Sequence, residues 1–269
     1  MIRRLEELWQ YRELIRNLVL RDLKARYKNS FLGVAWSWLN PLMMMIVYTL
    51  FFTVFLRNDS IEHYPVFLLC GLLPWNFFHD SIMQATGSIV GNGHLIKKVY
   101  FPREALPIAV VLSNLVNFLL ALPVFFVLAV VLGRPPNGWA LLLPVIIFLQ
   151  VIFSTGVAFF LATLNVFYRD TQIILGVVTL AWFFLTPVFY PIETVPQEAH
   201  ILGVALDARL WLRRLNPMAS LIASYRDLLY RGGPTGFDFL LRTALTSLLV
   251  LVIGYLVFQR FSGRFGEEV

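Results

Sequence analysis

The sequence predicts an all-α integral membrane protein with six transmembrane helices. Three observations lead to this fold class. Hydrophobic residues make up 58% of the 269 residues, charged residues make up only 14%, and the chain contains several long runs without a charge. The remaining polar side chains are too few to cover the surface of a soluble protein of this size. A lipid bilayer is therefore the expected solvent for most of the chain.

Residues 1–30 are predicted to form a cytoplasmic amphipathic helix rather than a signal peptide. Residues 1–28 contain eight basic side chains and no unbroken apolar stretch. Apolar side chains, including Trp9, recur at helical spacing on one broad face, and charged side chains occupy the other face. This pattern is typical of a helix in the membrane interface, but a helix that packs on a partner protein has the same pattern.

Six segments of the transmembrane domain, residues 31–261, are apolar enough to be membrane spans, which need about 20 residues each. The second is the weakest because Pro74 and Asp80 interrupt it, and residues 262–269 follow the last as a cytoplasmic tail. The spans are predicted at residues 36–56, 64–85, 105–132, 141–167, 173–190 and 238–259.

The distribution of basic residues predicts that both termini are cytoplasmic. An even number of spans places the termini on one side, and all four lysines, at positions 24, 28, 97 and 98, fall on that side. In the short loops on the opposite side, the only Lys or Arg residues are Arg57 and Arg134. Because the net charge of +6 is concentrated between the spans, it orients the chain, and no binding of nucleic acid is expected.

The sequence offers little that would support catalysis, metal binding or ion coupling. Cys70 is the single cysteine and the four histidines are far apart, so no metal site is expected. Five of the six spans lack ionisable residues within their apolar runs, the last of which is Thr243–Phe258, and we expect the exception, Asp80, to be solvated near the cytoplasmic end of its span. No lysine follows a glycine, which excludes a Gly-Lys-Ser/Thr phosphate loop. The chain is therefore not expected to be an enzyme or to hold a cofactor.

Two connections between the spans have unusual composition. In residues 91–107, a short helix at Leu95–Tyr100 is predicted to end at Pro102. The segment mixes basic side chains, Lys97, Lys98 and Arg103, with apolar side chains that we expect to be exposed, namely Leu95, Ile96, Val99 and Phe101. Either a protein partner or an anionic lipid surface would suit this segment. After the fifth span, prolines at positions 187, 191, 196 and 217 predict short, broken helices at the outer surface.

Five segments, taken together and in order, resemble the permease subunits of type-2 ABC exporters that move polysaccharide. This group includes the O-antigen, capsule and teichoic-acid export permeases. The likeness covers residues 10–261. The segments are Arg21-Asp-Leu-Lys-Ala-Arg-Tyr-Lys-Asn-Ser-Phe-Leu-Gly33, Trp36-Ser-Trp-Leu-Asn-Pro41, Leu95-Ile-Lys-Lys-Val-Tyr-Phe-Pro-Arg103, Asn165-Val-Phe-Tyr-Arg-Asp170 and Asn216-Pro217.

The resemblance implies a homodimer in the bacterial inner membrane with a channel between its two copies. Two separate nucleotide-binding subunits, which bind ATP and Mg²⁺, would dock below it, and lipid-linked polysaccharide would be the substrate. Residues 5–28 would be the interface helix, and the segments 186–196 and 212–230 would gate the exit. The residues of the coupling helix would be Leu95, Ile96, Lys97, Lys98, Phe101, Pro102 and Arg103, and the outer gate candidates are Pro187, Tyr190, Pro191, Asn216 and Pro217.

Aromatic residues of the spans are candidates for contacts with the polymer, because ring faces pack on the C–H faces of sugars. Membrane-interface belts and contacts with lipid are the alternative explanation. The channel candidates are Trp36, Trp38, Tyr48, Phe52, Trp75 and Phe159.

Three other functions remain open at this point. They are an ABC permease for a drug or small lipid, a membrane-embedded glycosyl or phospholipid transferase, and a passive channel. The transferase would need a cluster of acidic or histidine residues, which the sequence lacks. A neighbouring reading frame for a nucleotide-binding protein would favour the transporter.

Overall fold

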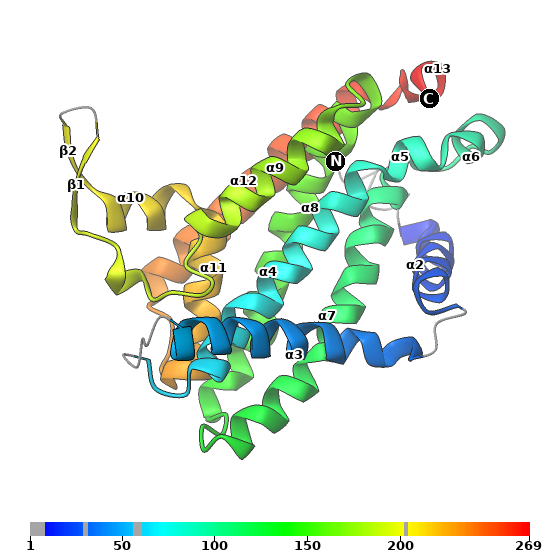
Figure 1. Ribbon diagram of the computed structural model, residues 1–269. Helices are drawn as coiled ribbons and strands as arrows, with labels where there is room; N and C mark the ends of the chain where they lie inside the picture. The colour runs from blue at the N-terminus through cyan, green and yellow to red at the C-terminus, as the bar shows by residue number, and fades with distance from the viewer. Residues whose placement is uncertain (1–8, 29–31, 56–60, 202–203) are drawn as a thin grey trace.

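The chain folds into a bundle of long helices with short helices at one end (Figure 1). The structure is a computed structural model that describes residues 9–28, 32–55, 61–201 and 204–269. By length and composition, five of its helical segments can cross a membrane. They are α3 (Trp36–Thr49) with the π-helical turn η2 (Leu50–Phe55), α4 (Tyr64–Thr86), α7 (Ala105–Val131), α8 (Leu143–Phe167) with the 3₁₀ turn η3 (Gly138–Leu142), and α12 (Phe237–Ser262).

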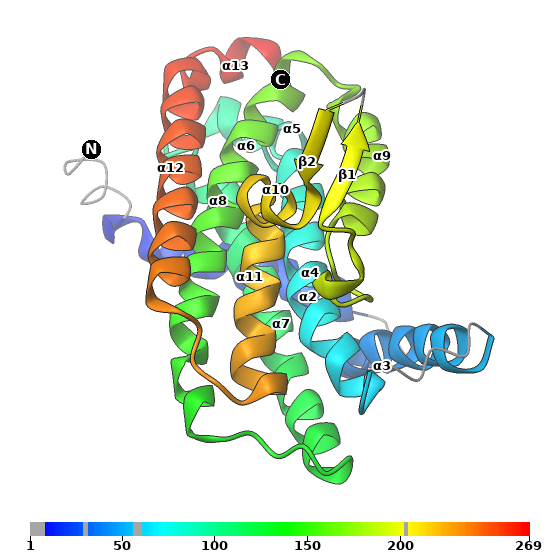
Figure 2. The same cartoon turned by 90° about the vertical axis from the view of Figure 1, so that its left-hand side faces the viewer.

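The predicted fifth span is shorter than a bilayer is thick. Helix α9 (Thr171–Leu185) has 15 residues, which at about 1.5 Å per residue spans about 22 Å of the roughly 30 Å hydrocarbon layer. It begins at the end of the bundle that carries the C-terminus (Figure 2). A helical membrane protein is confirmed, whereas the count of six spans is still a prediction.

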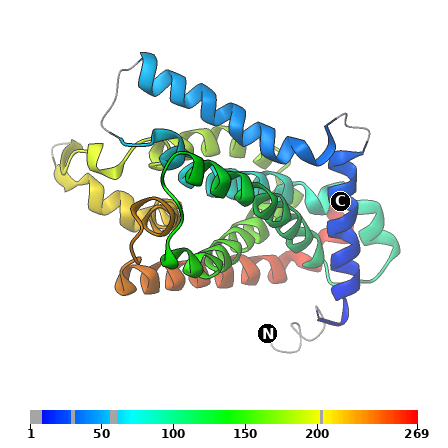
Figure 3. The ribbon, with the colours of Figure 1, turned by 90° about the horizontal axis from the view of Figure 1, so that it is seen from below.

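Helix α4 forms the centre of the bundle. It packs against α7, α8 and α11 (Pro217–Arg226), and most of its side chains are buried. In contrast, α3 lies along one side of the bundle (Figure 3), and Met45 is its one buried residue among those described. The apolar surface of α3 is therefore available to lipid or to another chain.

Four short helices gather at the end of the bundle that we call the basic end, because it contains Lys97 and Lys98. They are α2 (Arg12–Tyr27), α5 (Ser88–Gly91), α6 (Gly93–Lys98) and α13 (Phe265–Glu268). Buried apolar side chains from α2, α5, α6, α7, α8, α12 and α13 form a second hydrophobic cluster there, separate from the larger core around α4. The predicted interface helix coincides in part with α2, and residues 1–8 and 29–30 lie outside the described residues.

The connection between α9 and α12 contains the one departure from an all-helical fold in the described part of the chain. Strands β1 (Glu198–Ile201) and β2 (Val204–Asp207) pair antiparallel, with Glu198 opposite Asp207. The short elements on either side are η4 (Ile192–Thr194), α10 (Ala208–Leu215), α11 and η5 (Asp227–Arg231). Helices α10 and α11 begin at side-chain caps, Asp207 and Asn216, which accept backbone N–H bonds.

Candidate functional site

The predicted coupling segment begins with α6 and continues as a turn to the start of α7 at the basic end. Ile96 and Phe101, which we expected to be uncovered, are buried in the second hydrophobic cluster, at 8% and 6% exposure. The expectation was wrong because Phe265 and Leu18, from α13 and α2, belong to the same cluster and cover them. Ile96 and Phe101 therefore anchor the segment inside the chain.

The side chains that the segment does present to solvent lie between these two anchors. Lys97, Lys98, Val99 and Tyr100 are all exposed, and Tyr100 is 81% exposed. Leu95 and Arg103 are half-buried and Pro102 is buried. A cavity of about 380 Å³ lies beside the segment and is lined by residues 96–104, Ser262 and Gly263. The surface that a partner can reach is thus basic, with one valine and one tyrosine.

The C-terminal residues brace this segment. A guanidinium nitrogen of Arg169 donates to the carbonyl oxygen of Glu268 at 3.2 Å. Val269 packs on Gly93 at the first residue of α6. Helix α13 and Val269 therefore join the α8–α9 connection to the coupling segment, a link that no local sequence pattern indicates.

The five outer gate candidates lie together near the end of α9 and the start of α11. Asn216 connects the two helices, because its Oδ1 accepts from the Trp182 indole N–H at 2.9 Å and its Nδ2 donates to the Thr186 hydroxyl at 2.8 Å. Pro217 is the first residue of α11, and Pro187, Tyr190 and Pro191 belong to the segment that leaves α9. The sequence predicted these residues to act together, and the structure places them in one region.

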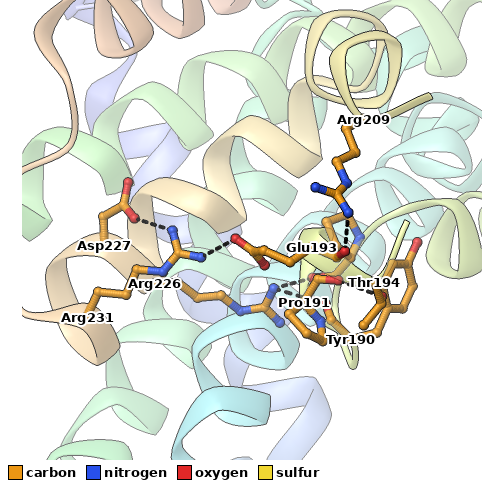
Figure 4. A network of polar contacts seen from close by, with 9 residues as sticks. Tyr190, Pro191, Glu193, Thr194, Arg209, Arg226, Asp227 and Arg231 are labelled. Atoms are coloured by element: carbon orange, nitrogen blue, oxygen red, sulfur yellow. Dashed lines mark hydrogen bonds and ion pairs between the residues drawn. The ribbon is translucent and has the colours of Figure 1, made fainter. Parts of the chain in front are cut away.

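Arg226 holds this segment in place. The side chain is 5% exposed, and its guanidinium donates to the carbonyl oxygens of Pro187 and Val188, both at 2.5 Å. It also donates to the carbonyl oxygen of Tyr190 at 3.4 Å (Figure 4). The guanidinium also lies over the Phe67 ring, 3.7 Å from its centroid. Burial lowers the pKa of Arg226 to about 10, so the group still carries its charge at neutral pH.

A second, more exposed set of contacts supports the same segment. Arg231 forms ion pairs with Glu193 at 2.9 Å and with Asp227 at 3.1 Å (Figure 4). Arg209 donates to the carbonyl oxygens of Glu193 and Val195. Exposed ion pairs contribute only about 0–1 kcal/mol each, so we assign the main role to Arg226. Arg226 lies in the segment 212–230, which the resemblance assigns to the gate, but no role of its own was predicted for it.

The channel candidates divide into exposed and buried residues. Trp36 and Trp38 are about half exposed, at 51% and 42%. Tyr48 and Phe52 are half-buried and stack on the Phe189 ring, with centroids 6.4 and 5.2 Å away.

Trp75 and Phe159 lie in the protein core, at 4% and 3% exposure. Trp75 contacts Phe78, and Phe159 contacts Phe258. These two rings are therefore not available to line a passage in this structure.

The rest of the described chain contains little other chemistry. No group of three or more His, Cys, Asp or Glu residues that could hold a metal ion occurs within it. The Asp80 side chain is half exposed and contacts His79 at 3.1 Å.

Comparison with known proteins identifies the family of the chain. The family model described as "ABC-2 type transporter" matches residues 13–230. This chain belongs to the ABC-2 transporter membrane family. It is therefore a multi-pass transport subunit rather than an enzyme, and ATP hydrolysis belongs to a separate subunit.

Several relatives of this ABC-2 subunit are export permeases. It is 39% identical over 269 residues, 100% of both chains, to the O-antigen export system permease protein RfbA of Myxococcus xanthus. It is 34% identical to an O-antigen export system permease protein RfbA of Klebsiella pneumoniae over 248 residues, and this aligned region covers 92% of this chain and 91% of the relative. The polysialic acid transport protein KpsM of Escherichia coli is 22% identical over 248 residues, 90% of this chain and 91% of the relative.

Proposed function

We propose that the chain is the membrane subunit of an ATP-driven exporter of lipid-linked polysaccharide, of the O-antigen or capsular kind. The observation that carries this proposal is the 39% identity, over the full length of both chains, to an O-antigen export permease. The identity to RfbA proteins of two organisms favours O-antigen over a drug or a small lipid.

In this proposal two copies of the chain form the passage in the bacterial inner membrane, with their termini in the cytoplasm. Helix α3, which buries only Met45 of its described residues, offers an apolar face for the second copy. Trp36 and Trp38 begin this helix and are exposed, so they are the aromatic residues best placed to meet the polymer.

The ATPase subunits would dock at the basic end, against Lys97, Lys98, Val99 and Tyr100. Because Ile96 and Phe101 anchor this segment in the second hydrophobic cluster, a push on the exposed residues displaces α7 and the packed ends of α2 and α12 together. The energy of ATP hydrolysis would reach the membrane helices by this rigid connection. The Arg226 network would hold the outer segment until that displacement releases it.

Reconstitution tests the proposal directly. The chain is purified with its nucleotide-binding subunit and placed in vesicles that contain lipid-linked polysaccharide. We expect ATP-dependent movement of the polysaccharide across the bilayer, and neither movement nor ATP hydrolysis by the chain alone. Passage without the ATPase subunit would support a passive channel, and robust ATP hydrolysis by the lone chain would also contradict the proposal.

A further inference from the structure

A cavity of about 280 Å³ lies where α2, α3, α4 and α7 meet, apart from the coupling segment and the outer segment. Four asparagine side chains, from three of the membrane-spanning segments, line it. They are Asn40 of α3, Asn76 of α4, and Asn114 and Asn117 of α7. A polar group in a membrane-spanning helix is costly unless it has a partner, and such groups commonly mark the path of a substrate.

Two of these side chains have no hydrogen-bond partner among the residues that the structure describes, namely Asn40 and Asn76. Asn117 accepts from the Tyr27 hydroxyl at 2.6 Å, which leaves its amide N–H groups unused. Asn114, in contrast, donates to the carbonyl oxygen of Val110 and to Gln84. The cavity therefore offers both free donors and free acceptors.

The charges around the cavity favour a neutral ligand. Arg26 lines it, but this guanidinium is already hydrogen-bonded to Gln84. The Asp80 carboxylate lines the same cavity and would repel a phosphate group. A diphosphate headgroup would find one cation there, Arg26, offset by one anion, Asp80, which is a poor match for several negative charges.

We infer that this cavity binds a sugar residue of the exported glycan through its asparagine side chains, an inference that depends on the proposed function. A carboxamide donates and accepts at once, as does a sugar hydroxyl group, so the free groups of Asn40 and Asn76 match hydroxyl groups of a ring. The Trp36 ring, about half exposed, lines the same cavity and provides an apolar face for the C–H face of the sugar. The volume is close to the lower limit for small organic ligands, about 300 Å³, which suits one sugar ring rather than several.

The position of the site gives it a role in loading the glycan. Residues at the C-terminal end of α2 and in the first turns of α3 line it, and α3 itself lies along one side of the bundle (Figure 3). The site would hold the glycan next to the exposed Trp36 and Trp38 before it enters the passage. Different sugars would be admitted as long as they present neighbouring hydroxyl groups.

The test is equilibrium binding to the purified transporter complex in nanodiscs without ATP. The probe is the polysaccharide of the producing cell, released from its lipid by mild acid so that no diphosphate remains. We expect Asn40→Leu and Asn76→Leu each to weaken binding about fivefold, and the double variant about 25-fold, as the loss of one or two neutral hydrogen bonds predicts. Thr246→Val is the matched control, because its hydroxyl donates within α12 to the Arg242 carbonyl and lies outside the cavity.

Two results would overturn the inference. If both asparagine variants bind the probe as the wild type does, the cavity holds only water. If polyprenyl diphosphate without a glycan displaces the probe from the wild-type complex, the site recognises the headgroup instead, and this measurement does not depend on the folding of any variant. Failure of the wild-type complex to export any polysaccharide would instead refute the proposed function, so the two failures are distinguishable.

Discussion

Gly254 of α12 lies so close to Gly156 of α8 that a Cβ atom added at Gly254 would be 2.0 Å from the Gly156 carbonyl oxygen. A Cβ atom added at Gly156 would in turn lie 2.6 Å from the backbone of Leu251. The two helices therefore pack backbone against backbone over this stretch. In lipid, where apolar side chains gain little from leaving their solvent, such close contact between small residues is a main source of helix association.

We predict that Gly254→Ala destabilises the protein by about 1–3 kcal/mol, because the added methyl group forces the two helices apart. The thermal unfolding of the purified protein in detergent measures the change. Gly176→Ala in α9 is the control, since no atom lies within 4 Å of a Cβ at that position. Equal melting temperatures for the two variants would show that α8 and α12 are not held by this contact.

Arg226→Met is predicted to release the segment that leaves α9. Three carbonyl oxygens lose their donor, and a buried polar group without a partner costs about 1–3 kcal/mol. Limited proteolysis between residues 186 and 196 should accelerate, and Arg226→Lys should restore only part of the protection because it lacks the planar fork. Arg242→Met, at an exposed arginine over Phe239, should leave the cleavage rate unchanged.

Substitutions of exposed and of buried residues in the coupling segment should have different effects, the first on binding of the ATPase subunit and the second on stability. Val99→Ser with Tyr100→Ser removes exposed apolar surface, so it should weaken binding of the ATPase subunit while the melting temperature stays the same. Ile96→Ala with Phe101→Ala opens cavities in a core and should cost several kcal/mol of stability, at about 2–5 kcal/mol for each site. Thermal unfolding and a pull-down of the ATPase subunit distinguish the pairs. Tight binding by the Val99/Tyr100 double variant would show that these two side chains do not contact the ATPase subunit.

Asp80→Asn is expected to leave transport intact, because Asp80 lines the asparagine cavity without being one of the groups proposed to bind the sugar. The carboxylate is half exposed and its contact with His79 is a surface pair of little strength. The rate of polysaccharide export per ATP hydrolysed, measured at several values of pH, is the appropriate readout. Loss of export with normal assembly and ATPase activity would instead indicate a proton-linked step at this residue.

The spans were predictable because they depend only on local composition. Apolar runs bounded by charged residues or turns place α4 at 64–86 and α7 at 105–131, within one residue of the predicted ends. Helix α9 was harder, since the apolar run continues to Tyr190 whereas the helix ends at Leu185. The proline at position 187 disfavours helical geometry at Thr186. Composition alone did not show that the helix ends before this proline, because the residues that follow it are also apolar.

The packing of side chains could not be predicted in the same way. Ile96 and Phe101 were expected to be uncovered because nothing in their own segment indicates that Phe265, more than 160 residues later, packs in the same cluster. The asparagines of the cavity were overlooked for another reason. A search for ionisable residues passes over amides, although an amide in a bilayer also requires a partner.

The arrangement of four exposed side chains between two buried ones at residues 96–101 has an evolutionary consequence. Four consecutive residues, Lys97 to Tyr100, face solvent between two that are fixed in the core. Under the proposed function, the outward set can drift with a changing ATPase partner while the inward pair stays under selection for folding. Exchange of these four positions between related permeases is therefore a route by which one membrane subunit acquires the motor of another, without a cost to its own stability.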